Sequence, residues 1–167
     1  MRKTWFQKIA DKKTFPKVLK LEKRFPCYNA VKKMGADEGD PVVLVNASEI
    51  LPLMAEVSKG KLVTIREISL EIAAQHKVKG CCSLVTGILI MSIANAAEEA
   101  VQKKEKSALA RVPYWRTLKV GGFLNEKYPG GLEEQKKRLE KEGHRIIARG
   151  KKYQVADLEG HLWNFKK

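Results

Sequence analysis

Two helical segments joined by a short turn constrain the fold of this chain more than any other feature. Thr64 and Glu67 have the spacing of a capping box, which opens a helix by satisfying two free backbone amides. Apolar residues then recur at helical spacing and predict a helix that stops near Lys79–Gly80. A further apolar segment over 83–104 predicts the second helix of this pair, which is largely buried. Helix, short turn and helix of these lengths are typical of a helix-turn-helix.

The residues before this pair predict one strand and two more helices. The β-branched run Val42–Val45 is a candidate strand. Asn46 or Ser48 can cap a helix that runs to about Val57. Near the start of the chain, apolar residues close to helical spacing predict a short amphipathic helix within residues 1–12, which docks on the main domain.

The residues after the pair predict a small β-hairpin at the end of the domain. A strand is expected over 116–120, and a charged helix over 132–142 that is ended by Gly143 in a left-handed cap. Residues 144–156 are typical of a β-hairpin with Gly150 in its turn. Three helices followed by a hairpin predict a winged helix-turn-helix, which is mainly α with small β.

The positive charge is concentrated at the amino terminus. The net charge is +14, and residues 1–34 contribute +9 of it through eleven Lys or Arg against two acidic residues. Residues 35–41 form a polar, acidic link. We therefore expect a basic amino-terminal extension, 1–41, and a main domain, 42–167. Such a charge attracts phosphate backbones, although a lysine-rich tail can also serve solubility alone.

Composition argues against a membrane protein, a disulfide framework and a metal site. No run of 18 apolar residues occurs, and lysines interrupt every apolar stretch near the amino terminus, so we expect a cytoplasmic protein. The three cysteines are an odd number, two of them adjacent, and no histidine lies at ligand spacing from them. We predict no cofactor and no metal. The cysteines concerned are Cys27, Cys81 and Cys82.

Four short motifs follow one another along the chain. They are Gly60–Thr64, Leu84–Gly87, Pro113–Arg116 and Tyr128–Gly131, and a Leu-x-x-Glu-Gly segment follows at 139–143. In this order they resemble the DNA-binding domain of the alkylguanine-DNA alkyltransferases, the methylated-DNA–protein-cysteine methyltransferase family. The resemblance extends from about residue 42 to 156, and a longer link over 96–111 departs from the family pattern.

The resemblance places other side chains where the family has its reactive pair. Tyr114 stands at the position of the alkyl-accepting cysteine, and Trp115 at that of the histidine which activates it. A phenol with an ordinary pKa near 10 and an indole do not replace an activated thiolate. The resemblance therefore implies an alkyltransferase-like protein that is not an enzyme. Such a protein binds double-stranded DNA, senses alkylated guanine without alkyl transfer and hands the lesion to DNA repair proteins.

The resemblance also implies two sets of site residues. The candidate lesion pocket consists of Tyr114, Trp115, Tyr128, Pro129, Gly130 and Glu142. The candidate DNA contacts are Lys61, Thr64, Arg66, Ser83, Leu84, Thr86, Arg116 and Lys119.

Two of the matched positions differ from the family, and a third agrees with it. Leu84 and Ile65 stand where the family has its base-replacing arginine and its tyrosine. Leu84 could act as an apolar wedge between bases, but a core leucine is the favoured interpretation. Glu142 matches the carboxylate that holds the histidine, and the alternative is a pair with Arg116 or Lys141.

Two other functions remain open on the sequence. Cys82 is expected near the start of a helix and beside lysines, which lowers a thiol pKa, so alkyl transfer by Cys81 or Cys82 is one alternative. No base is placed beside Cys82 in the sequence. The other alternative is a winged-helix adaptor that binds a protein or RNA.

Overall fold

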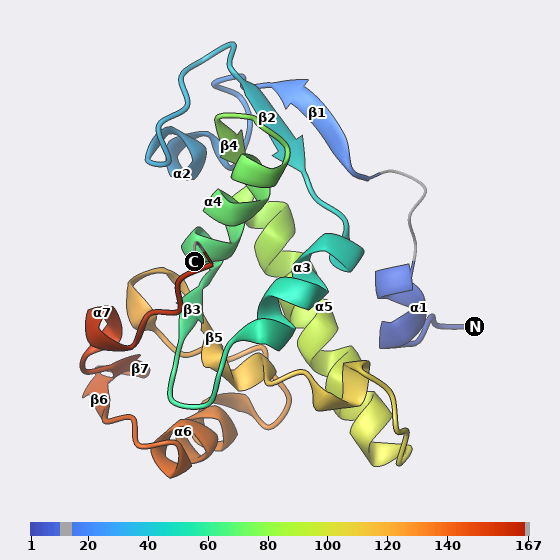
Figure 1. Cartoon of the computed structure of the whole chain (residues 1–167), viewed down its shortest axis with the longest axis vertical. Coiled ribbons are helices and arrows are strands. Elements are labelled where there is room, and N and C mark those ends of the chain that lie inside the picture. The colour runs from blue at the N-terminus through green and yellow to red at the C-terminus, as the bar shows by residue number, and fades with distance from the viewer. Residues whose placement is uncertain (11–14, 166–167) are drawn as a thin grey trace.

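The computed structural model describes residues 1–10 and 15–165, and it is mainly helical with small sheets (Figure 1). The helices are α1 Trp5–Ala10, α2 Tyr28–Lys32, α3 Ala47–Glu56, α4 Ile65–Gln75, α5 Ser83–Gln102, α6 Gly131–Lys141 and α7 Leu158–His161. Short 3-10 turns are η1 Leu109–Arg111, η2 Tyr114–Arg116 and η3 Val120–Gly122. The strands are β1 Lys17–Lys20, β2 Pro41–Leu44, β3 Val63–Thr64, β4 Gly80–Cys81, β5 Thr117–Leu118, β6 Ile146–Arg149 and β7 Lys152–Val155.

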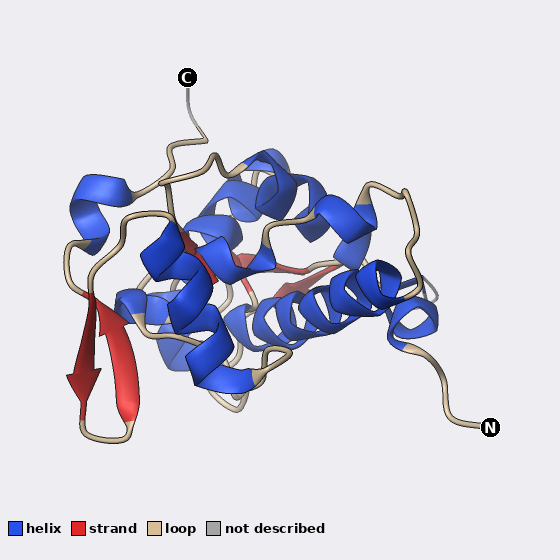
Figure 2. Cartoon of the chain, turned by 90° about the horizontal axis from the view of Figure 1, so that it is seen from below, coloured by secondary structure: helices blue, strands red, loops and turns tan. Residues whose placement is uncertain are grey.

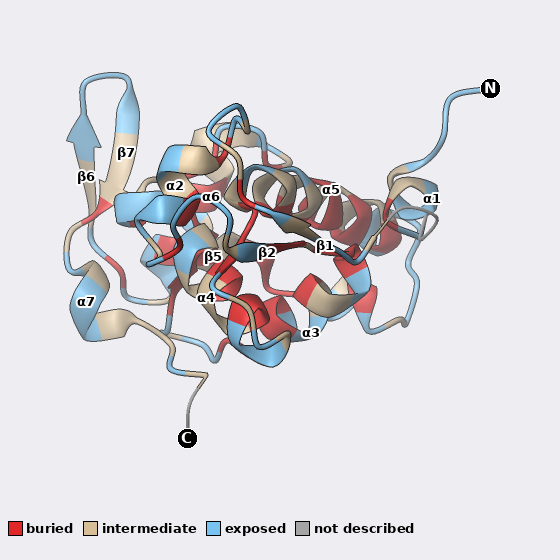
Figure 3. Ribbon diagram, turned by 90° about the horizontal axis from the view of Figure 1, so that it is seen from above, coloured by how far each residue is buried: buried red, intermediate tan, exposed pale blue. Residues whose placement is uncertain are grey.

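Helix α5 is the central element of the core. It contacts α1, α3, α4, η1 and η2, and Figure 3 shows buried residues along its length. By length and composition alone this helix could cross a membrane, with a mean hydropathy of 1.5. Its buried face packs against the surrounding helices, as the core helix of a globular domain does. The helix predicted over 83–104 is therefore confirmed, with its end at Gln102.

The capping residues predicted from the sequence begin the helices in the structure. Asn46 caps α3 and forms a capping box with Glu49, and Thr64 forms the predicted box with Glu67 at the start of α4. The predicted end of α4 near Lys79–Gly80 is wrong. The helix ends at Gln75 because the chain turns at Lys77, which has a left-handed φ of 55°, and then enters β4.

The amino-terminal residues are built into the fold. Helix α1, which was predicted, lies against α5; residues 11 and 12 of that prediction lie outside the described residues. Strand β1 pairs antiparallel with β2, which pairs parallel with β4. Leu21 and Val31 are buried in a core cluster with Val42 and Cys82. The division at residue 41 stays a prediction, and the sheet crosses that position.

The carboxy-terminal residues form a smaller layer beside the helices. β3 pairs with β5, and α6 packs on the β6–β7 hairpin, which projects from one side of the molecule (Figure 2). The predicted hairpin is confirmed, with Gly150 at φ 62° in its turn. The strand predicted over 116–120 is limited to Thr117–Leu118, because 3-10 turns occupy the residues on both sides.

Candidate nucleic-acid interface

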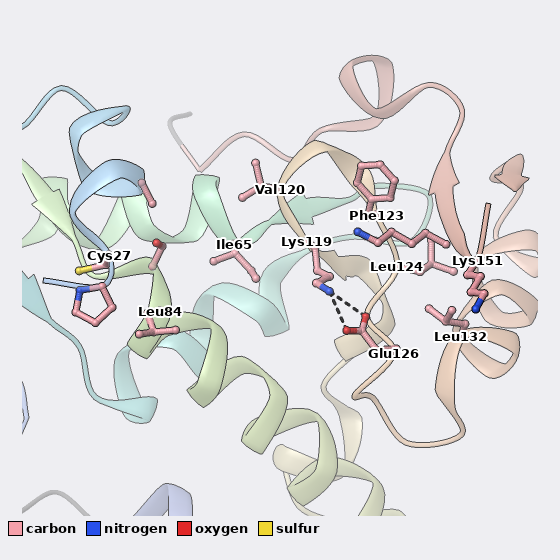
Figure 4. A pocket seen from close by; sticks show the side chains of 14 residues that line it. Cys27, Ile65, Leu84, Lys119, Val120, Phe123, Leu124, Glu126, Leu132 and Lys151 are labelled. Carbon is pink, nitrogen blue, oxygen red and sulfur yellow. Dashed lines mark hydrogen bonds and ion pairs between the residues drawn. The ribbon is translucent and has the colours of Figure 1, made fainter. Parts of the chain in front are cut away.

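A groove of about 640 Å³ crosses the amino-terminal end of α5 (Figure 4). One end of the groove is formed by Pro26, Cys27 and Ala30, in and just before α2. The other end is formed by Lys151 and Lys152 at the turn of the hairpin. Between these ends lie the first residues of α4 and α5 and the segment from β5 to α6. The groove thus joins segments from the beginning, middle and end of the chain.

Apolar side chains are exposed on the first turns of α5 beside this groove. The exposed fractions are 49% for Leu84 and 53% for Ile88, and 57% for Val120 in η3. The favoured interpretation of Leu84 as a core residue is therefore wrong. Ile65, at the start of α4, lines the same groove and is half-buried. One side of the first turns of α5 is therefore only partly covered by the rest of the protein.

Lysines line the groove on the side of β5 and the hairpin, and one of them is already paired. Lys119 Nζ lies 2.9 and 3.1 Å from the two carboxylate oxygens of Glu126, and both residues line the groove. The hydrogen bond from Lys119 lowers the pKa of Glu126. Lys151 and Lys152 are exposed, and Lys152 lies 5.8 Å above the Phe123 ring. The groove therefore carries positive charge at the hairpin turn, whereas Glu126 offsets the charge of Lys119.

The other candidate DNA contacts divide into exposed and internal residues. Lys61 and Arg66 are exposed, and Ser83 is half-buried at the groove. Thr64 is 2% exposed and serves as the cap of α4. Thr86 is fully buried, where its hydroxyl donates to the Cys82 carbonyl at 2.9 Å. The two threonines hold local structure and offer no surface to a ligand.

Arg116 is held inside the protein by Glu142. Its guanidinium Nε lies 2.9 Å from one Glu142 oxygen and Nη2 lies 2.7 Å from the other, while Nη1 donates to the Val57 carbonyl at 2.7 Å. Trp115 Nε1 donates to the same carboxylate at 3.2 Å. Burial alone would raise the pKa of Glu142, but the hydrogen bonds from Arg116 and Trp115 outweigh it and lower that pKa. The predicted alternative pair of Glu142 with Arg116 is confirmed.

Tyr114 fills the space beside α5 with its own ring. It is 3% exposed, and its ring makes edge-to-face contacts with Trp115 at 5.6 Å and with Tyr128 at 5.5 Å between centroids. Its hydroxyl donates to Glu98 at 3.1 Å, and Tyr128 donates to the Thr117 carbonyl at 2.7 Å. Burial raises the pKa of both tyrosines. The aromatic residues assigned to the lesion pocket thus lie together, packed against one another.

The Tyr128–Gly131 loop leads into α6 through two left-handed residues. Gly130 has φ 80°, and a Cβ there would lie 2.6 Å from the Cβ of Glu134. This position therefore requires glycine. Pro129 is half-buried, and Gly130 is exposed. The loop fixes the start of α6 and, with it, the positions of Gln135 and Arg138 below the aromatic residues.

All three cysteines are buried free thiols. Burial raises the pKa of Cys81 to about 11 and that of Cys27 to about 12. Cys82 is 5% exposed. Among the described residues, no group of three or more Cys, His, Asp or Glu side chains could hold a metal ion.

Several residues of the site have no signal in the sequence. Arg138 lies 5.4 Å from the Tyr114 ring centroid and 3.4 Å from Glu98, and Gln135 donates to the Trp115 carbonyl at 3.0 Å. Charged residues on a charged helix appear as a solvated face in the sequence. The contribution of α2 to the groove was also missed, because only folding brings Ala30 close to Leu84.

Two solved structures are similar to this chain. One is S. pombe Atl1 in complex with damaged DNA containing O6-carboxymethylguanine, at 21% sequence identity and a TM-score of 0.48. The other is S. pombe ATL in complex with DNA, at 19% identity and a TM-score of 0.48. Each match covers 71% of this chain and 94% of the other. No protein-family model and no curated protein sequence matches the chain.

Proposed function

We propose that this protein binds duplex DNA without a catalytic step, through a winged helix-turn-helix face formed by α4, α5 and the β6–β7 hairpin. The observation that carries the proposal is the exposure of Leu84 and Ile88 beside the groove that ends at Lys151 and Lys152. Aliphatic side chains within a basic surface are the combination with which minor-groove proteins open a base step while lysines neutralise phosphates. Leu84 is the wedge in this proposal.

The proposal includes the sensing of alkylated guanine for repair, which the resemblance to alkyltransferase-like proteins implies. The ring of Tyr114 occupies the space between Trp115 and Tyr128, so an extruded base enters there only if that ring moves. The movement gives up the hydrogen bond to Glu98. Extrusion itself costs a few kcal/mol, and less for a damaged base that pairs poorly. Lesion sensing therefore depends on a rearrangement of Tyr114.

Competitive binding tests both parts of the proposal. The full-length protein is titrated with a labelled duplex, and unlabelled duplexes of the same sequence, with or without one alkylguanine, compete. A stronger competitor with the lesion supports DNA binding and sensing together. Equal competition supports DNA binding and rules out sensing, and no binding to duplex DNA at low salt contradicts the proposal as a whole.

Alkyl transfer is tested separately by the mass of the intact protein. A buried thiol with a raised pKa is a poor nucleophile, since the thiolate is the reactive species. After incubation with alkylated DNA we expect an unchanged mass. A mass gain of one alkyl group mapped to Cys81 or Cys82 would assign the protein to the enzymes.

A further inference from the structure

The helix α2 stands at the opposite end of the groove from the hairpin, and it carries basic residues. Pro26, Cys27 and Ala30 line the groove from this side. The next residue on the same face, three positions after Ala30, is Lys33, which has helical backbone angles at the end of α2. Lys33 is exposed.

Lys33 is also available for a charged ligand. It makes no ion pair with any residue in the described ranges, whereas Lys23 pairs with Glu38 at 3.3 Å and Arg24 with Glu22 at 3.2 Å. Its neighbour Lys32 projects from a different face of the same helix, where its Nζ lies 6.0 Å above the Tyr28 ring. The two adjacent lysines therefore differ in direction relative to the groove.

We propose that one sugar-phosphate strand of the duplex lies along the groove from α2 to the hairpin turn, and that Lys33 binds a phosphate at the α2 end. The inference rests on the proposed function and adds a contact surface to it. Lys151 and Lys152 line one end of the groove, and Lys33 follows the α2 residues that line the other end. Most of the side chains between the two ends are apolar, and the charged pair Lys119–Glu126 lies among them. A polyanionic strand with apolar sugar and base edges complements such a path.

In this proposal the positive charge of Lys33 is held by a folded helix, α2, and not by a flexible tail. Leu21 and Val31 are buried, and β1 is hydrogen-bonded to β2, so removal of residues 1–34 would disrupt the core as well as remove charge. Single charge-neutralising substitutions separate these effects. Lys33→Gln and Lys32→Gln form a matched pair, and Lys106→Gln adds an exposed control beyond the far end of α5.

The salt dependence of duplex binding tests the inference. Each phosphate contact that is lost makes the plot of log K against log salt shallower by about 0.9. We expect this change for Lys33→Gln, and also for Lys152→Gln at the hairpin end, but not for Lys32→Gln or Lys106→Gln. The unfolding temperature of each of the four variants is measured to check that it folds.

The outcomes separate this inference from the proposed function. Absence of duplex binding by the unmodified protein contradicts both. In a second outcome, Lys152→Gln changes the salt dependence of binding, whereas Lys33→Gln and Lys32→Gln change it equally or leave it unchanged. This outcome overturns only the contact at α2. Acetylation of lysines in the unmodified protein provides a second measurement. DNA should protect Lys33 more than Lys32, and equal labelling of the two also overturns the inference.

Discussion

The indole nitrogen of Trp115 donates a hydrogen bond to Glu142 over 3.2 Å, between residues 27 positions apart. By the resemblance, Glu142 stands where the alkyltransferases have the carboxylate that holds their histidine. In this chain the carboxylate accepts hydrogen bonds from the Trp115 indole and from the Arg116 guanidinium. An indole does not pass on a proton at neutral pH, so this network can orient side chains without activating a nucleophile.

Substitution of Glu142 by glutamine should destabilise the protein strongly. The side chains of Arg116 and Glu142 are 13% and 9% exposed, and loss of one partner leaves a charge buried without compensation. For a buried pair we expect a loss of about 3–5 kcal/mol in the free energy of unfolding. Urea denaturation measures it, with the exposed Glu140→Gln on the same helix as the control. Equal small losses in both variants would show that the Glu142 network contributes little.

Tyr114 should contribute mainly through its ring. Tyr114→Phe keeps the edge-to-face contacts and loses one hydrogen bond to a carboxylate, for which we expect a cost of about 1.5–3 kcal/mol at most. Tyr114→Ala removes the ring from a buried site and should cost about 3–5 kcal/mol. Thermal or urea unfolding gives both values. A Phe variant as unstable as the Ala variant would mean that the hydroxyl, and not the packing, fixes this region.

Stability should fall as the pH drops below about 6.5, the ordinary pKa of histidine. His144 is 4% exposed, and neither ring nitrogen has a hydrogen-bond partner among the described groups. Burial, His161 and Arg116 lower its pKa, against an opposing effect of Glu142. The unfolded chain then binds a proton at a pH where the folded chain does not, which favours unfolding.

The variant His144→Leu isolates this effect. It should flatten the decline in unfolding free energy between neutral pH and the folded pKa, whereas carboxylates such as Glu142 act at lower pH because their pKa is already low. An unchanged decline in His144→Leu would assign the pH dependence to another group.

Glu126→Gln should tighten duplex binding. The carboxylate neutralises Lys119 inside the groove, and it repels phosphate. Its removal frees one lysine, so we expect a salt dependence steeper by about 0.9 in the logarithmic plot. Both residues are substantially exposed, so the stability of the fold should change little. Weaker binding by Glu126→Gln would indicate that Glu126 itself contacts the ligand.

Leu84→Ala should weaken DNA binding while leaving stability nearly unchanged. Val101, near the other end of α5, provides a matched control, because both side chains are 49% exposed. Loss of a wedge should reduce affinity and any bending of the duplex, as measured by titration and by energy transfer between labelled DNA ends. If Leu84→Ala and Val101→Ala bind equally well, Leu84 is not a wedge.

The parts of the fold that depend on local rules were predictable from the sequence. The capping box of Thr64 and Glu67, the left-handed Gly143 and the hairpin around Gly150 each follow from backbone chemistry within a few residues. Strand β5 was overestimated, since the pairing partner Val63–Thr64 offers only two positions.

The site was less predictable, because its contacts join distant residues. An apolar residue on an apolar helix gave no sign that Leu84 is exposed, since exposure depends on which neighbours pack against each turn. The position of α2 at the groove depends on the pairing of β1 with β2, and neither strand's sequence specifies that partner. The burial of Thr86 likewise depends on the contact of α5 with the strand segment that ends at Cys81.

Equilibrium titration of a labelled duplex with the full-length protein, repeated over a series of salt concentrations, is the most direct test of the central claim. We expect saturable binding, with log K falling linearly as log salt concentration rises. The affinity should fall in Leu84→Ala but not in Val101→Ala. No detectable binding at the lowest salt concentration, or binding unaffected by salt, would contradict it.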